Sequence, residues 1–178
     1  MRLPPAFFCL AIALGLAACA PKEAAPTAAG AAPAAPGRRV IEIMTGDNMK
    51  YSVPEIDAAP GEELKVVMSS NSSQPREVMA HNFVLLDKDA DLVDFIQAAS
   101  TAKADGYLPT ELMGEVIAHT KLLGGGQSDE VVFKAPAAPG EYPYFCTFPG
   151  HYLTGMHGTL VVKATAGATP GAAVPAAH

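Results

Sequence analysis

Short apolar runs that are rich in β-branched residues recur through the middle of the chain, and turn signals separate them. Pro60-Gly61, Gly124-Gly125-Gly126 and Pro139-Gly140 are such signals, because proline and glycine favour turns. Many short runs with this punctuation are typical of a β-sandwich or a β-barrel. The pattern predicts strands over residues 40–44, 63–68, 81–86, 129–133, 142–146 and 158–162.

One segment has a different period. Between Ala90 and Ala102 the apolar side chains recur at the spacing of a helix rather than of a strand. Asp87 and Asp89 precede this segment and are available to cap its first turn. We therefore expect one helix, packed on the outside of an otherwise all-β domain. The apolar positions are Leu92, Val93, Phe95, Ile96 and Ala99.

Residues 1–18 are predicted to be an export signal. Arg2 supplies a positive charge, and residues 6–18 form an apolar stretch of signal-peptide length. An uncleaved membrane anchor is the alternative interpretation, but the stretch is short for a membrane span. Export places the mature chain on the periplasmic side of a bacterial membrane.

The end of this signal, Leu16-Ala17-Ala18-Cys19, resembles the bacterial lipobox. In that motif the cysteine is lipidated and becomes the first mature residue, so Cys19 is expected to anchor the protein to the membrane. Cleavage after Ala20 by an ordinary signal peptidase is the alternative, because alanines flank Cys19. The protein would then be soluble in the periplasm.

Two low-complexity segments flank the part of the chain that can build a core. Residues 19–37 are rich in alanine and proline, and we expect a semi-extended tether there. Residues 166–178 have the same character, which leaves one folded domain over residues 38–165. The whole chain has 178 residues and a formal net charge of −6, without lysine or arginine runs. A nucleic-acid partner is therefore not expected.

Cys146 is the only thiol expected in the folded domain. The chain has three cysteines, of which Cys9 leaves with the signal and Cys19 is used at the processing site. Thiols of exported proteins normally form disulfides. A solitary thiol in such a domain is either buried and inert or held by a metal ion.

Three other candidate metal ligands accompany this thiol. His151 and Met156 follow Cys146 closely, and His81 heads an earlier predicted strand. A lone cysteine or methionine is more often a packing residue. The ordered spacing Cys-x4-His-x4-Met after an earlier His-Asn pair favours a joint metal site. One thiolate, two imidazoles and a thioether suit a blue copper centre, whereas structural zinc rarely uses methionine.

Three motifs of this chain resemble those of the cupredoxin family, in particular azurin and auracyanin. They are VMAHNFVL over residues 78–85, VIAHTKL over residues 116–122 and FCTFPGH over residues 145–151. The resemblance extends from about residue 40 to residue 163. It implies an all-β fold, an eight-stranded Greek-key β-sandwich with a short external helical flap. It also implies one-electron transfer rather than enzymatic catalysis.

The resemblance assigns roles to individual residues. It implies that His81, Cys146 and His151 are the equatorial ligands of one copper ion, and that Met156 is the axial ligand. Asn82 corresponds to the family residue whose hydrogen bonds tie the ligand loops together beside the thiolate.

The chain also departs from azurin. Azurin has a glycine before its first ligand histidine, and the carbonyl of that glycine lies near copper. Ala80 takes this position here. The resemblance therefore implies a weak contact from the Ala80 carbonyl to copper. Four residues separate His151 from Met156, as in auracyanin, and azurin has one fewer. The azurin disulfide has no counterpart. His119 falls on an azurin position outside the ligand set, and we expect it at the surface or in strand packing.

A blue copper site of this kind predicts a carrier of single electrons. Met49, Met79 and Phe148 lie at or beside family positions around His151, and exposed apolar patches often mark transient docking sites; core packing is the alternative for the two methionines. The expected partners are redox proteins, such as c-type cytochromes or copper or haem oxidoreductases. The alternative function is a copper carrier that hands the ion to an apo partner.

Overall fold

The computed structural model describes residues 38–163. Several sequence predictions therefore lie outside the described residues: the export signal (residues 1–18), lipidation at Cys19, the tether (residues 19–37) and the tail (residues 166–178). No helix in the described part of the chain combines the length and the apolar character that a membrane crossing requires.

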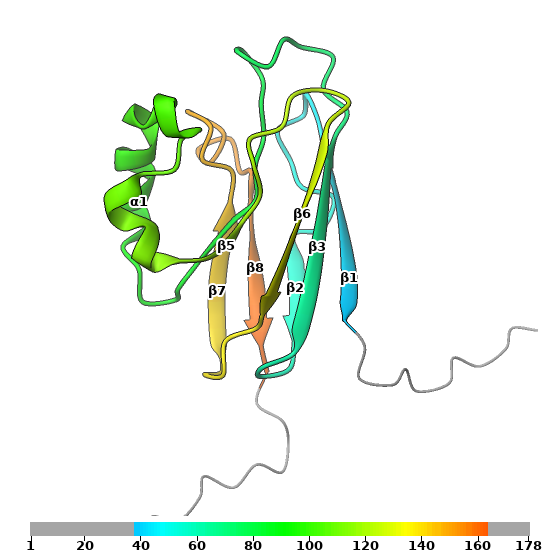
Figure 1. The fold of residues 1–178 in the computed structure, drawn as a ribbon, viewed down its shortest axis with the longest axis vertical. Coiled ribbons are helices and arrows are strands. Elements are labelled where there is room, and N and C mark those ends of the chain that lie inside the picture. Colours follow the sequence, from blue (N-terminus) through cyan, green and yellow to red (C-terminus); the bar gives the residue numbers. More distant parts are fainter. Residues whose placement is uncertain (1–37, 164–178) are drawn as a thin grey trace, which may run out of the picture. The chain divides into compact units, whose positions relative to one another are not determined.

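Eight strands of the described range form two sheets that pack face to face (Figure 1). This arrangement, with one short α-helix beside it, confirms the predicted all-β sandwich with an external helical flap. The first sheet has the order β1 (Arg39–Thr45), β3 (Glu63–Ser70) and β6 (Ser128–Lys134). The second has the order β2 (Glu55–Ala58), β8 (His157–Val162), β7 (Gly140–Phe145), β4 (Val84–Leu86) and β5 (Val116–His119).

Alternation along the strands builds the core between the sheets. In β3, Leu64, Val66 and Met68 are buried, while the residues between them are half-buried on the outer face. The same period of two in β8 buries Leu160 and Val162. Because successive side chains of a strand point to opposite faces, both sheets turn one apolar face inward. Aromatic rings fill the space between them, among them Phe83, which directly precedes β4, and Tyr144 on β7.

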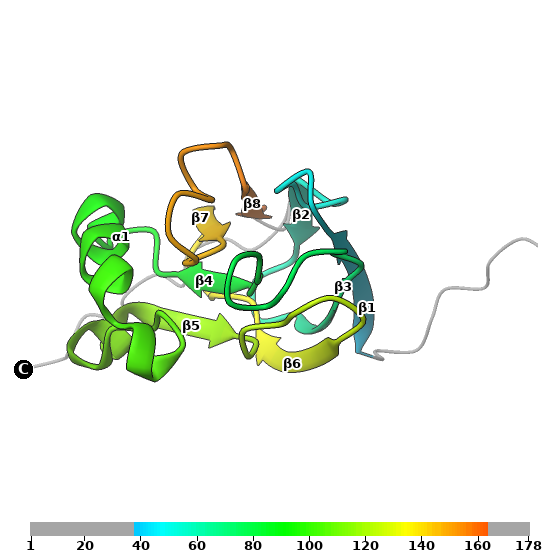
Figure 2. The ribbon, with the colours of Figure 1, turned by 90° about the horizontal axis from the view of Figure 1, so that it is seen from above.

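β4 is buried on both faces, since all three of its residues are inaccessible to solvent. Leu85 points into the sandwich core, whereas Val84 and Leu86 belong to a second cluster with Phe95 and Ala99 of α1 (Leu92–Thr101). Figure 2 shows α1 beside β4 and β7, on the side of the molecule away from β1. The helical flap is thus an outer layer that covers one part of the second sheet.

The predicted helix boundaries and cap need correction. The helix begins at Leu92 rather than Ala90, and its cap is Asp91, whose side chain accepts from the N–H groups of Val93 and Asp94. Asp87 instead accepts from the N–H of Asp89 in the preceding turn. Two short 3-10 helices, Lys103–Asp105 and Thr110–Glu115, complete the flap and were not predicted.

The strand predictions need two corrections. The strand predicted over residues 81–86 is only Val84–Leu86, and its long apolar run reflects burial on both faces rather than strand length. His81 lies before it and makes an isolated bridge to Leu123. β2 and β5 were absent from the predicted strands. They are only four residues long each, too short for a clear pattern.

The two ends of the sandwich differ in what they carry. β7 and β8 are antiparallel, with Phe145 opposite His157 at one end and Gly140 opposite Val162 at the other. The loop over residues 146–156 therefore lies at the first end, together with the turn between β5 and β6. Arg39 begins β1 and Val162 ends β8 at the opposite end (Figure 1).

Candidate metal centre

The loop between β7 and β8 positions three of the four predicted ligands. Cys146 follows directly after β7, and its N–H donates to the carbonyl of Met156 at 3.2 Å. The N–H of Met156 donates to the carbonyl of His151 at 3.0 Å, and the N–H of His151 to that of Phe148 at 3.1 Å. The loop is therefore closed by its own backbone, which fixes the three side chains relative to one another.

The fourth predicted ligand, His81, comes from a separate segment. Its N–H donates to the carbonyl of Leu123 at 2.9 Å, and the N–H of Leu123 donates back to His81 at 2.7 Å. Both residues are buried. This pair of hydrogen bonds holds His81 against the β5–β6 turn, so the histidine is placed without being part of a regular strand.

The structure brings His81, Cys146 and His151 together. Their candidate ligand atoms all lie within 4.8 Å of one another. The sulfur of Cys146 is 3.5 Å from Nδ1 of His151, and the two imidazole ring centres are 5.0 Å apart. Each of the three residues is at most 3% exposed. Met156 is inaccessible to solvent and belongs to the same buried cluster as Cys146.

Burial shifts the proton affinities of this group toward the neutral forms. It raises the pKa of the Cys146 thiol from 9.0 to about 12, although backbone hydrogen bonds from Asn82 and Phe148 act in the opposite direction. Burial also lowers the pKa of His151 to about 4, with a further contribution from the nearby His81. The pKa of His81 is lowered for the same main reason. Without a cation, the site therefore holds a protonated thiol and two neutral imidazoles.

These donors fit a soft metal cation. Both ring nitrogens of His81 are buried and have no hydrogen-bond partner among the described residues. Leaving such a group unpaired costs about 1–3 kcal/mol, so an orphaned imidazole in a cluster of this kind indicates a metal ligand. A bound cation also favours the thiolate, which burial alone opposes. Thiolate, imidazole and thioether donors together suit copper.

Asn82 connects the two ligand segments. Its side-chain N–H donates to the hydroxyl of Thr147 at 2.7 Å, and its side-chain oxygen accepts from the N–H of Thr147 at 2.9 Å. The Tyr51 hydroxyl donates to the Asn82 carbonyl at 2.6 Å. The residue after His81 is thus fastened to the residue after Cys146. The carbonyl of Ala80 is turned toward the same site, 3.8 Å from the sulfur of Cys146.

The three predicted patch residues are half-buried at this end of the domain. The ring of Phe148 lies 4.7 Å from that of His151, measured between centres. The Met49 sulfur accepts a hydrogen bond from the Thr154 hydroxyl in the ligand loop at 3.8 Å. Met79 is half-buried in the segment before His81. Met49 also packs against the core, so it is shared between core and surface.

Two apolar residues near the site were missed by the sequence prediction. Leu153, in the ligand loop, is 84% exposed, and Val78, in the segment before His81, is 62% exposed. Each is next to or close to a predicted ligand or patch residue in the sequence, which is a signal that could have identified them. Large apolar side chains at this level of exposure add to the apolar surface of the ligand loop and of the segment before His81.

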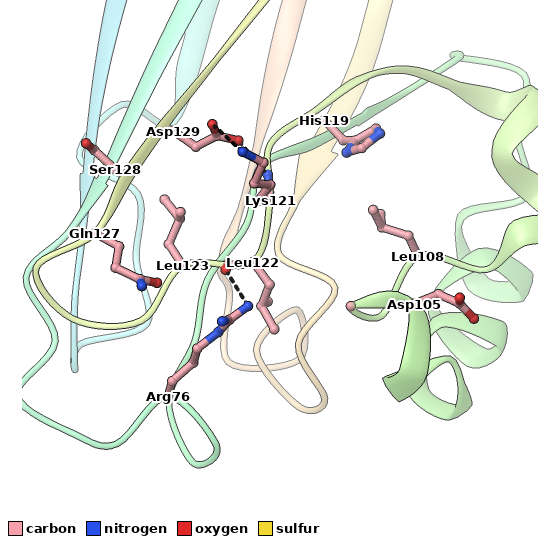
Figure 3. A pocket seen from close by; sticks show the side chains of 11 residues that line it. Arg76, Asp105, Leu108, His119, Lys121, Leu122, Leu123, Gln127, Ser128 and Asp129 are labelled. Atoms are coloured by element: carbon pink, nitrogen blue, oxygen red, sulfur yellow. Dashed lines mark hydrogen bonds and ion pairs between the residues drawn. The ribbon is translucent and has the colours of Figure 1, made fainter.

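His119 lies apart from the three grouped ligands, as predicted. It is half-buried on β5, and its Nδ1 is 3.3 Å from the carbonyl of Thr120. Its side chain lines a cavity of about 560 Å³ between the flap and the β5–β6 turn, which Figure 3 shows. Lys121 and Asp129 line the same cavity, with their charged groups 3.9 Å apart.

The sandwich with its helical flap and the buried group of His81, Cys146 and His151 define a cupredoxin, the class of β-sandwich proteins that hold one copper ion at such a site. A family model described as copper binding proteins of the plastocyanin/azurin family matches residues 39–163, and the chain belongs to this family. Its cofactor is one copper ion, and its class is that of blue copper electron carriers.

Comparisons with individual proteins agree. The chain is 37% identical over 124 residues to azurin iso-2 of Methylomonas, which covers 68% of this chain and 95% of that protein. It is 34% identical over 168 residues to outer membrane protein H.8 of Neisseria meningitidis serogroup B, and the match covers 79% of this chain and 88% of that protein. The structure of reduced auracyanin from Roseiflexus castenholzii superposes with a TM-score of 0.63 at 33% identity, covering 71% of this chain and 99% of that one.

Proposed function

We propose that this protein carries single electrons between redox partners on the periplasmic side of a bacterial membrane, through one copper ion held by His81, Cys146, His151 and Met156. The observation that carries the proposal is the buried group of His81, Cys146 and His151, with both His81 nitrogens unpartnered. When bound, copper supplies the one-electron change between Cu(I) and Cu(II) at a site that suits both states.

The chain contributes a rigid and dry set of donors. The closed loop over residues 146–156 and the bridge between His81 and Leu123 fix the donors before the ion arrives. The Asn82–Thr147 hydrogen bonds keep the two segments at a constant spacing. Because each equatorial candidate is at most 3% exposed, water has little access. A site that cannot rearrange suits a carrier that must accept and release electrons without reorganisation.

Met156 and Ala80 are proposed to act along the axis of the site. Met156 is fully buried beside Cys146, which supports a thioether contact. The Ala80 carbonyl faces the same sulfur at 3.8 Å, which supports a weak second contact from the opposite segment. Weak axial donors tune the reduction potential of blue copper sites rather than hold the metal.

The proposed path to a partner leads through His151 and the apolar patch around it, formed by Met49, Met79 and Phe148. His151 itself is 3% exposed, and Phe148 packs against its ring. A partner would therefore approach His151 across apolar side chains. Redox proteins such as c-type cytochromes are the proposed partners.

A copper-loaded chain tests this function and separates it from copper delivery. An electron carrier should show an intense blue absorption band, exchange electrons rapidly with itself, and retain copper through repeated reduction against a moderate Cu(I) chelator. Cys146→Ser should abolish the blue band while the β-sheet circular dichroism signal stays. A colourless copper-loaded protein would refute the site. Prompt loss of Cu(I) with slow self-exchange would instead establish a copper carrier.

We also propose that lipid on Cys19 anchors the protein and that residues 19–37 act as its tether. The lipobox-like sequence supports this, as does a relative of 34% identity that is named an outer membrane protein. Replacing Cys19 with serine should move the protein from the membrane fraction to the soluble fraction, or leave it unprocessed. Equal distribution of both forms would favour the soluble periplasmic alternative.

A further inference from the structure

A groove of about 190 Å³ opens beside the apolar patch, between the helical flap and the segments at the ligand end. It is separate from the buried copper ligands, although Phe148 forms part of its wall. The lining residues come from the segment before His81, from the flap, from the β5–β6 turn and from the ligand loop. They are Arg76, Glu77, Lys103, Tyr107, Leu122 and Phe148.

The groove has an excess of positive charge. Arg76 and Lys103 contribute two cations, and Glu77 one anion. Within residues 38–163, none of the three takes part in a salt bridge. Arg76 is oriented by a hydrogen bond from its guanidinium to the Leu122 carbonyl at 3.0 Å, which Figure 3 shows. Four of the five N–H donors of a guanidinium remain after one such bond, so the group can still bind a carboxylate.

The neighbouring cavity that contains His119 is a less suitable anion site. It is larger, at about 560 Å³, but its lysine, Lys121, lies 3.9 Å from the Asp129 carboxylate. Asp105, on the same short helix as Lys103, also lines that cavity and not the groove. The groove and the cavity therefore differ in the charge of their walls, although Arg76 lines both.

An aromatic chain connects the groove with the ligand group. The rings of Tyr107 and Phe148 meet edge to face, with centres 5.2 Å apart, and Phe148 lies 4.7 Å from His151. Tyr107 is only 8% exposed, so most of its side chain is buried in the wall of the groove. A redox group seated over the groove would be separated from His151 by packed rings rather than by solvent.

We propose that this groove receives a carboxylate that flanks the redox group of an acidic partner protein, with Arg76 and Lys103 as its binding groups. The chain as a whole carries a formal charge of −6 and would repel such a partner. At close range the local charges decide, because charges beyond about 10 Å are largely screened at 0.1 M salt. The groove therefore selects the orientation in which the partner meets the ligand end. This inference rests on the proposed electron-transfer function.

Lys103→Gln tests the proposal, and Lys134→Gln is its matched control. Both lysines are exposed, neither makes a salt bridge within the described range, and each substitution removes one positive charge. Lys134 ends β6 opposite Glu63, at the end of the sandwich away from the ligand loop. The probes are cytochrome c with succinylated lysines, which is anionic, and native cytochrome c, which is cationic and has the same haem.

At about 0.1 M ionic strength, where the overall charge of the chain is largely screened, Lys103→Gln should slow electron transfer with the succinylated cytochrome by about twofold, since it removes a charge roughly 10 Å from several carboxylates. Lys134→Gln should change the rate by less than about 1.5-fold, because it is remote. With native cytochrome c, Lys103→Gln should leave the rate unchanged or raise it. High salt should remove the difference between the variants.

Equal effects of the two substitutions would overturn the proposal, because net charge alone would then explain them. The proposal is also overturned if Lys103→Gln slows electron transfer with hexacyanoferrate(III) but not with the succinylated cytochrome. The groove would then be only a site for small anions. Binding of the succinylated cytochrome to the immobilised, copper-loaded chain should weaken in the same order as the rates fall. This binding measurement tests the proposed role of the groove even if the wild-type protein transfers no electrons. Absence of electron transfer would refute the proposed function, not the groove.

Discussion

Removing copper should leave a protein whose stability falls on acidification, and His151 should account for much of that fall. Burial lowers the pKa of His151 from 6.5 to about 4 in the folded protein. Between these two values the unfolded chain binds a proton that the folded chain does not. The free energy of unfolding therefore decreases as the pH falls through this window. The pKa of His81 is lowered as well, so its contribution has the same sign.

The size of the effect follows from the two pKa values of His151. One pKa unit corresponds to about 1.4 kcal/mol, so the whole shift represents about 3 kcal/mol, reached only below pH 4. Between pH 7.5 and pH 5 the expected loss from His151 is about 2 kcal/mol. This is a large part of the stability of an ordinary domain, which is about 5–15 kcal/mol. Copper should flatten the profile, because a nitrogen bound to copper is closed to protons.

Guanidinium unfolding of the copper-free protein at pH 7.5 and pH 5 measures this loss. The test variant is His151→Gln, which keeps a polar side chain and removes the titrating ring. The control is His157→Gln, because His157 is exposed and begins β8 only six residues later. The control should lose stability in parallel with the wild type, and His151→Gln should lose about 2 kcal/mol less. If His151→Gln keeps the wild-type pH dependence, the conclusion that His151 is buried and neutral in the copper-free protein is refuted.

Three further predictions concern other parts of the domain. Met156→Leu should retain the blue band and raise the reduction potential, measured by redox titration; loss of colour would make Met156 a primary ligand. Asn82→Ala should lower the free energy of unfolding by about 2–3 kcal/mol, because it leaves the buried groups of Thr147 unpaired, and a change below 0.5 kcal/mol on denaturant titration would contradict the proposed connection. Asp91→Ala should cost about 1 kcal/mol through the lost helix cap, whereas Asp89→Ala should cost little, and equal losses would argue against the observed cap.

The strand and helix predictions succeeded where burial imposes a clear period. β3 alternates along its whole length and was predicted almost in full. β4 misled the prediction, because a strand covered on both faces has a continuous apolar run that does not show its ends. The helix cap was placed too early, since several aspartates precede the helix and only the backbone geometry selects Asp91.

The candidate site likewise has a part that the sequence could predict and a part that it could not. Cys146, His151 and Met156 could be grouped from their spacing alone, because one loop holds all three. His81 was added because it heads an earlier predicted strand, but the contact with Leu123 that holds it at the site is a long-range pairing that spacing cannot reveal. The groove beside the patch was not predicted. It depends on how the flap places Lys103 next to Phe148, which only the packed structure determines.

The placement of the chain ends gives the domain a direction. The described chain enters at Arg39 and leaves at Val162 at one pole, while the ligand loop occupies the other. At about 3.3 Å per residue, a strand such as β7 separates the poles by roughly 20 Å. If Cys19 carries lipid as proposed, the tether joins the domain at the pole away from the ligand loop. The copper end is then free to meet electron donors and acceptors in the aqueous space.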